Sequence, residues 1–308
     1  MGTIRETSTG RTRFLESDYL IGRNNGSLTL NEPYVSGVHA EIRWTGQVWE
    51  LKDLGSRNGT YLDGRRVDPI TSHRITKGSR IGFGKMQQEW EVVDDAGPGV
   101  MAIPLEGGDP VLLEGDLIAL PSSTDPRATI YRALDGTWLL ETSDELPRPI
   151  SHHSVFRAVG QSWRFSCSDM SPATLATSDL ADFGFMVSRL QLRLSVSLDE
   201  EYINVRATCD QREIDLGARR HNFLLLTLAR RRLADAAAGC PDTACGWIDL
   251  EELAHDETMA PPHLNIDVFR IRRQFTEEGV VDGAAIIERR PQPRQIRIGT
   301  GHIVITRV

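Results

Sequence analysis

The sequence predicts a multidomain protein with an all-β sandwich at the N-terminus, a β-rich middle region and an α+β domain at the C-terminus. Its 308 residues exceed what one compact domain usually holds. Between residues 13 and 93, short β-type runs alternate with Gly, Asn or Asp, which is typical of a β-sandwich. Helical periodicity begins only at Arg219, so we expect the helices in the last third of the chain.

Composition shifts along the chain predict the domain boundaries. A turn-rich run follows residue 93, and residues 168–179 are rich in Ser, Thr, Ala and Pro. We therefore expect a sandwich at 1–97, a middle domain at 98–168, a linker at 169–184 and a C-terminal domain at 185–308.

Parts of the middle region repeat features of the first domain. Residues 113–116 resemble 15–18, and the run from Ala128 to Trp138 resembles the run from Ala40 to Trp49. Two interpretations stay open: a degenerate internal repeat, or unrelated β-hairpins that look alike. Gly22-Arg23 has no counterpart, since the chain reads Ala119-Leu120 there.

Charge is distributed unevenly. The net charge is −8; residues 96–216 carry 9 basic and 18 acidic side chains, a net of −9, whereas residues 217–308 carry 13 and 12, a net of +1. No apolar run approaches the roughly 18–20 residues of a membrane span, and nothing at Met1 resembles a signal peptide. Four unevenly spaced cysteines make a poor disulfide framework. We expect a cytoplasmic protein without a membrane partner.

Three short motifs stand in order in the first domain: Gly22-Arg23, Ser36-Gly37-Val38-His39, and Ser56-Arg57-Asn58-Gly59-Thr60. This set resembles the forkhead-associated (FHA) domain, whose pattern is GR, SxxH and SxNGT. The resemblance covers roughly residues 3–95 and implies an FHA β-sandwich that binds phosphothreonine. A phosphothreonine needs a cation and hydrogen-bond donors, and these residue types supply both.

The resemblance also implies a role for each residue. Arg23 and Ser36 match the residues that contact phosphate, Asn58 matches the one that binds the peptide backbone, and Arg57 occupies the family's variable position. The structural residues of the motif support the site: Gly22, His39, Gly59 and Thr60.

The C-terminal domain is predicted as strands, three helices and a terminal hairpin. The pattern of residues 214–229, 268–275 and 295–299 resembles the winged-helix output domain of response regulators, which contains a helix-turn-helix. A third helix is expected over 264–278, with Leu264 and Phe275 among its buried residues.

The opposite face of that helix is the candidate DNA-binding surface. Helical spacing places Phe269, Arg270 and Arg273 outward, with Arg272 on the flank. Arginines there suit guanine edges or phosphates, and the hairpin adds Arg289, Arg290, Arg294 and Arg297 for contacts to the backbone or minor groove. The low net charge leaves two alternatives open, a protein-interaction surface and a purely structural module.

No catalytic motif is present, so we expect no enzyme, cofactor or metal. The sequence predicts a phosphothreonine-dependent signalling protein that regulates transcription by binding DNA. The alternative is a phospho-dependent scaffold whose C-terminal domain binds protein. The expected partner is a phosphothreonine-containing protein, either a Ser/Thr kinase substrate or the kinase itself, together with duplex DNA in the first case. The oligomeric state is not predicted.

Overall fold

The computed structural model describes the chain except residues 25, 70, 88, 143, 144, 146, 168–184 and 255–260, and omits the side chains of 254, 261, 262 and 291. The chain divides into two compact units. Unit 1 contains Met1–Met101 and two short later segments, His152–Ser154 and the one beginning at Phe165. Unit 2 contains most of the middle region and the C-terminal region. The predicted linker lies outside the described residues.

Unit 1 is a sandwich of two sheets, with strand orders β2-β1-β11-β10-β7-β8 and β4-β3-β5-β6-β9. Apolar side chains from both sheets form one core, because alternate residues such as Ala40 and Ile42 point inward. The predicted N-terminal β-sandwich is confirmed. The strands are β1 Thr3–Glu6, β2 Thr12–Phe14, β3 Asp18–Gly22, β4 Leu28–Thr29, β5 Ala40–Trp44, β6 Trp49–Asp53, β7 Thr60–Leu62, β8 Arg65–Arg66, β9 His73–Ile75, β10 Arg80–Phe83 and β11 Trp90–Asp94.

The middle region forms two four-stranded sheets, with strand orders β13-β12-β19-β18 and β14-β15-β16-β17. The segments beginning at Ala128 and Trp138 pair as a hairpin, as do those beginning at Ala40 and Trp49 in unit 1. This likeness fits both interpretations, so the repeat stays a prediction. The strands are β12 Met101–Pro104, β13 Val111–Leu112, β14 Leu117–Ser122, β15 Asp125–Arg132, β16 Trp138–Thr142, β17 Arg148–Ile150, β18 Val155–Ala158 and β19 Gln161–Ser166.

The C-terminal region has the predicted order of strands, three helices and a hairpin. One sheet has the order β22-β21-β20-β26 and another β23-β25-β24. The elements are β20 Gln191–Val196, β21 Ile203–Cys209, β22 Arg212–Ala218, α1 Asn222–Ala237, β23 Ile248–Asp249, α2 Leu250–Ala254, α3 Pro261–Glu277, β24 Ile287–Pro291, β25 Arg294–Ile298 and β26 Ile303–Arg307, with 3-10 turns at Val187–Arg189 and Gly283–Ile286.

The end of the chain differs from the prediction in one respect. The sequence predicts the hairpin as the last element, but the chain turns at Gly299 and Thr300 after β25, and an additional strand, β26, pairs in parallel with β20. The Thr300 hydroxyl donates to the carbonyl of Leu190, which fixes this turn against the first sheet. The last strand of the chain, β26, is therefore the edge strand of the first sheet of the C-terminal region.

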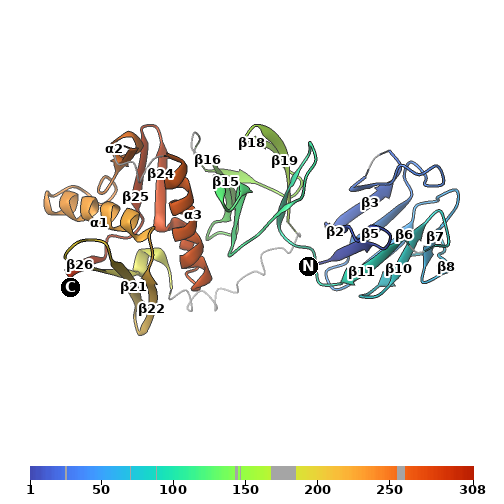
Figure 1. Ribbon diagram of the computed structural model, residues 1–308, viewed down its shortest axis with the longest axis horizontal. Helices are drawn as coiled ribbons and strands as arrows, with labels where there is room; N and C mark the ends of the chain where they lie inside the picture. Colours follow the sequence, from blue (N-terminus) through green and yellow to red (C-terminus); the bar gives the residue numbers. More distant parts are fainter. Residues whose placement is uncertain are drawn as a thin grey trace. The chain divides into compact units, whose positions relative to one another are not determined.

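Helix α3 packs on two sides. Leu264, Val268, Ile271 and Phe275 face the core of the C-terminal region, as predicted. Figure 1 shows α3 between β24 and β15, so a strand of the middle region lies along its other side. The regions predicted as separate middle and C-terminal domains therefore form one compact unit. No helix in the described part of the chain is long and apolar enough to cross a membrane.

Candidate functional site

Three loops of unit 1 bring the motif residues together. Arg23 follows β3 directly, Ser36 lies in the loop before β5, and Arg57 lies in the loop between β6 and β7. The amide of Arg23 donates to the carbonyl of Ser36 at 2.9 Å. The amide of Arg57 donates to the Ser36 hydroxyl at 3.0 Å. Ser36 thus joins all three loops, which we call the three-loop surface.

His39 holds two of these loops from beneath. It is fully buried, and its Nδ1 accepts a hydrogen bond from the Ser36 amide at 3.0 Å. Nδ1 therefore carries no proton, so Nε2 carries it and donates to the carbonyl of Gly59 at 3.3 Å. Burial lowers the pKa of His39, although Asp53 and the Gly59 carbonyl act in the opposite direction. A neutral imidazole fits this arrangement, because both ring nitrogens have partners.

Asp53 organises the loop that carries Arg57 and Asn58. Its buried carboxylate accepts hydrogen bonds from the Gly55 and Ser56 amides and from the hydroxyls of Ser56 and Thr60. Burial raises its pKa, but these hydrogen bonds outweigh burial and lower the pKa below its ordinary value. The prediction gave Asp53 no role. An Asp two residues before a Gly and three before a Ser is the available signal for such a turn.

Position 59 requires a glycine. Its φ is +84°, a conformation that side-chain-bearing residues rarely adopt, and a Cβ there would collide with the side chain of Arg66. Its amide donates to the Ser56 hydroxyl at 2.9 Å. The predicted supporting roles of Gly59 and Thr60 therefore have a physical basis, since both residues fix the loop that ends at β7.

Asn58 lies at the edge of the three-loop surface. Its exposed side-chain amide donates to the carbonyl of Tyr34 at 2.8 Å. The Lys85 ammonium lies 3.7 Å from the centre of the Tyr34 ring, which adds a cation close to Asn58. Sequence reasoning missed both Tyr34 and Lys85, because neither belongs to the three motifs.

The charges on this surface are open to solvent. Arg23 and Arg57 are exposed, and neither guanidinium has a hydrogen bond or ion pair to any residue in the part of the chain that the structure describes. Both arginines are joined to Ser36 through their backbone amides, so two exposed cations belong to the three-loop surface. Such a surface suits a dianion that also accepts hydrogen bonds.

The structure places the predicted DNA-contacting residues of α3 differently. Phe269 and Arg272 are 3% and 2% exposed, so the expectation that they face solvent is wrong. Helical spacing identified the core face correctly, but it carries no information about a sheet packed on the opposite face. Arg273 pairs with Glu277 and Glu114, both at 2.8 Å. Arg270 is exposed and makes no hydrogen bond or ion pair with any described residue.

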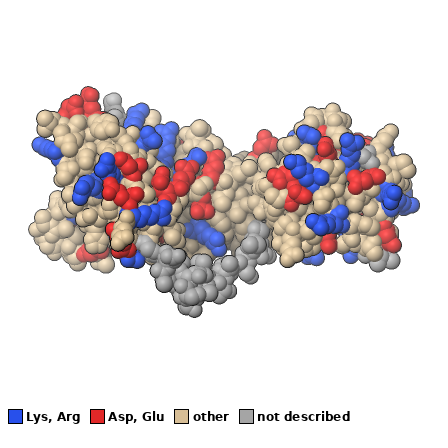
Figure 2. All heavy atoms as spheres, turned by 90° about the horizontal axis from the view of Figure 1, so that it is seen from below, with Lys and Arg blue, Asp and Glu red and all other residues tan. Residues whose placement is uncertain are grey.

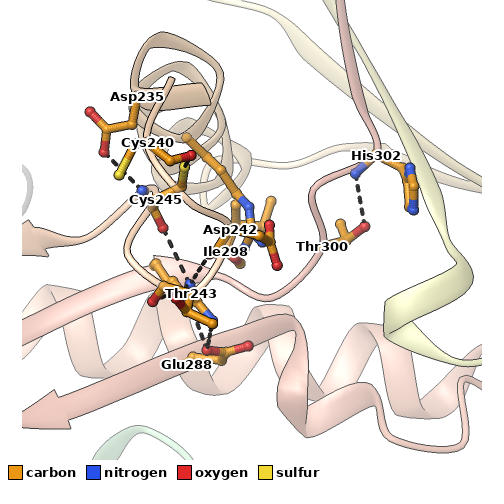
Figure 3. A network of polar contacts seen from close by, with 12 residues as sticks. Asp235, Cys240, Asp242, Thr243, Cys245, Glu288, Ile298, Thr300 and His302 are labelled. Carbon is orange, nitrogen blue, oxygen red and sulfur yellow. Dashed lines mark hydrogen bonds and ion pairs between the residues drawn. The ribbon is translucent and has the colours of Figure 1, made fainter. Parts of the chain in front are cut away.

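Most arginines of the β24-β25 hairpin make contacts within the C-terminal region. Arg297 donates to the carbonyls of residues 242, 243 and 245 and pairs with Glu288 at 2.7 Å (Figure 3). Arg290 donates to the Thr243 carbonyl and stacks on Trp247. Arg289 is mostly buried and donates to Asn265. Arg294 and Arg290 are the exposed members of this group, and Arg290 is engaged by Thr243 and Trp247.

The surface charge is mixed. On the face drawn in Figure 2, basic and acidic side chains are interspersed over each unit. This face therefore has no broad patch of one sign. The chemistry that the described residues can perform most directly is anion binding at the three-loop surface of unit 1.

Comparison with known proteins identifies the class. The family model for the FHA domain matches residues 19–84, a range that contains Arg23, Ser36, His39 and Asn58. These residues form an FHA domain, and FHA domains are modules that bind phosphothreonine peptides in signalling. The predicted FHA sandwich is confirmed.

The relatives match this part of the chain. The FHA domain-containing protein FhaB of Mycobacterium tuberculosis is 40% identical over 76 residues, which are 24% of this chain and 48% of FhaB. Protein FraH of Nostoc is 44% identical over 55 residues, 18% of this chain and 19% of FraH. The chain thus spans about half of FhaB and less of FraH.

A solved structure is also similar. The FhaA FHA domain, complexed with the intracellular domain of Rv3910, is 35% identical and is matched over 30% of this chain and 99% of that chain, with a TM-score of 0.27.

Proposed function

We propose that the FHA domain of this protein binds a phosphothreonine peptide at the three-loop surface. Arg23 pairs with the phosphate, the Ser36 hydroxyl donates to it, Asn58 holds the peptide backbone, and Arg57 adds a second cation. The observation that carries the proposal is that Arg23, whose guanidinium has no hydrogen bond or ion pair in the described chain, is joined to Ser36 through the backbone.

The electrostatics support this assignment. A phosphothreonine carries about −1.5 to −2 charges at neutral pH. Because Arg23 and Arg57 have no internal partner in the described chain, no ion pair has to be broken before a phosphate binds. The loops are also held in place in advance by His39 and Asp53, which reduces the entropy lost on binding.

A peptide titration tests the proposal. The full chain should bind a phosphothreonine peptide selected from a library more tightly than its unphosphorylated form, and Arg23→Ala should lose at least about 2 kcal/mol of that affinity. Arg74→Ala is the matched control, because Arg74 is an exposed arginine on β9, the far edge strand of the same sheet. The proposal is contradicted if the protein binds the phosphorylated and unphosphorylated peptides equally well. It is also contradicted if Arg23→Ala and Arg74→Ala bind the phosphopeptide equally well.

The wider function is that of a signalling protein that couples kinase activity to an output in unit 2. The order of strands, three helices and hairpin supports a winged-helix output domain that binds duplex DNA and regulates transcription. Arg270, Arg290 and Arg294 are the predicted DNA contacts that are exposed. The alternative is a scaffold in which unit 2 binds protein; the engagement of Arg272 and Arg273 inside unit 2 favours it for the conformation described here.

Salt dependence separates these two outputs. A DNA-binding unit 2 should retain members of a random duplex library at about 50 mM salt and lose them as salt rises, because bound phosphates release counterions. A folded full-length protein that retains no duplex at low salt, with or without phosphopeptide, would favour the scaffold.

A further inference from the structure

The outward face of α3 is occupied by the chain's own β14-β15-β16-β17 sheet. Leu117 and Ala119 of β14 form a buried apolar cluster with Phe269 of α3 and Ala284. About two helical turns further along α3, the hydroxyl of Thr276 donates to the carbonyl of Gly115 at 2.5 Å. The residues that helical spacing predicts as a recognition surface are therefore a docking surface in this structure.

Charged groups complete the contact. Arg272 donates to both carboxylate oxygens of Glu141, at 3.0 and 3.1 Å, and both side chains are almost fully buried. Arg289 approaches the same carboxylate at 3.5 Å, and the Tyr131 hydroxyl donates to it at 3.3 Å. At the rim, Arg273 pairs with Glu114. Glu141 of the sheet and Glu114 just before it thus pair with three arginines, two from α3 and one from β24.

The two sides of the contact have separate cores. Every described member of the C-terminal core lies between residues 185 and 305, and none comes from residues 102–151. Of the described apolar clusters that include α3, the sheet contributes to the small one around Phe269, whereas Leu264, Val268, Ile271 and Phe275 anchor α3 from its other side. Helix α3 can therefore keep its fold when the sheet leaves.

The nature of the contact also favours release. Burying a carboxylate and arginines has a desolvation cost that largely cancels their attraction, so such pairs add little net stability compared with apolar packing. Contacts between domains of one chain commonly allow movement unless they are large and hydrophobic. Residues 102–151 contain 3 basic and 9 acidic side chains, a net of −6, so an acidic sheet covers an arginine-bearing face.

We infer that the β14-β15-β16-β17 sheet is an autoinhibitory cover that masks an anion-binding face of α3. Glu141 and Glu114 occupy the positions next to Arg272, Arg289 and Arg273 that the phosphates of duplex DNA take when the sheet is released. This regulation rests on the proposed DNA output of unit 2 and is independent of the phosphopeptide site. In the docked state Arg270 is exposed and Arg273 is partly exposed, and release frees Arg272, Arg289 and Arg273 from the two glutamates.

Two substitutions in the cover, made in the full chain, test the inference. Glu141→Gln removes the charge that holds Arg272, and Ala119→Gln forces a larger, uncharged side chain into the apolar cluster. Glu145→Gln and Ala237→Gln are matched controls, because they make the same changes at exposed positions outside the contact. Hydrogen–deuterium exchange of peptides from α3 and β15 should become at least about tenfold faster in both cover variants and stay unchanged in the controls.

A polyanion probe then tests what release exposes. Both cover variants should elute from immobilised heparin at higher salt than wild type and the controls, because the freed arginines pair with sulfates. Unchanged exchange in both folded cover variants overturns the inference, since the sheet would then be a permanent layer. Faster exchange without stronger heparin retention overturns it as well, since the face would not bind anions.

The outcomes separate this inference from the proposed function. Far-ultraviolet circular dichroism and the phosphopeptide affinity of unit 1 report whether each variant is folded, and if one variant misfolds the other decides. Stronger heparin retention with no binding of any duplex supports the cover and contradicts the DNA output alone. Loss of phosphopeptide binding in wild type contradicts the FHA proposal and leaves the cover unaffected.

Discussion

Glu141 of β16 and Arg272 of α3 form a buried, bidentate ion pair across 131 positions of the chain. Arg272 also donates to the carbonyl of Ile287, so one guanidinium ties together the middle sheet, the helix and the hairpin. An arginine that faces solvent on a recognition helix would not have a buried carboxylate and a backbone carbonyl as partners. The pair therefore keeps Arg272 and the adjoining part of α3 inaccessible to solvent.

Replacing the pair with apolar side chains should restore docking. Glu141→Gln alone leaves Arg272 without its counter-charge, and we expect it to release the sheet. The variant that combines Glu141→Leu, Arg272→Met and Arg289→Met leaves no arginine without its counter-charge beside β16, because Arg289 also pairs with Glu141. It should return α3 to within about twofold of the wild-type exchange rate, because apolar residues of similar volume often replace buried ion pairs without loss. Exchange in this variant as fast as in Glu141→Gln contradicts this account.

Ser36→Ala should weaken phosphopeptide binding by about 1–3 kcal/mol. The substitution removes a hydroxyl that accepts the Arg57 amide and that we propose donates to the phosphate. Ser36→Thr should retain most of the affinity, because it keeps the hydroxyl. Ser79→Ala is a suitable control, since the Ser79 hydroxyl also accepts a backbone amide, that of Thr76, away from the motifs. Isothermal titration with one phosphopeptide compares all four proteins, and equal loss in Ser36→Thr would argue against the hydroxyl.

His39 should make the FHA domain less stable at mildly acid pH. Burial lowers its pKa in the folded domain, so below the ordinary value of 6.5 the unfolded chain binds a proton that the folded chain does not. Stability is therefore complete above pH 6.5 and falls as the pH drops toward the lower folded pKa. The melting transition that phosphopeptide shifts identifies this domain in the full chain. His39→Gln should remove the pH dependence and His73→Gln should keep it; a flat profile in wild type contradicts the argument.

Arg297→Ala should destabilise unit 2 by about 2–3 kcal/mol, whereas Arg270→Ala should change its stability by less than about 0.5 kcal/mol. Arg297 satisfies three loop carbonyls and stacks on Trp247, so its removal leaves several acceptors unpaired. Arg270 has no such partners in the described chain. Urea unfolding measures both effects. Similar stability of the two variants would show that the hairpin does not depend on this arginine.

The sequence by itself determined the FHA domain and most of its site. Ser56, Asn58 and Gly59 lie within a few positions of Asp53, so the hydrogen bonds that shape this loop are local and leave a recognisable motif. The helices of unit 2 and the buried face of α3 were predictable for the same reason, because helical periodicity is a property of neighbouring residues.

Only the tertiary structure decided what lies on the other face of α3. Phe269 and Arg272 satisfy the pattern of an exposed helix face, and their partners Ala119 and Glu141 belong to strands more than a hundred residues earlier in the chain. Helical spacing shows which side chains share a face but not what packs against that face. A long-range contact between an acidic sheet and an arginine-bearing helix leaves no local signal, so the same residues fit a DNA-binding surface in the sequence and a covered one in the fold.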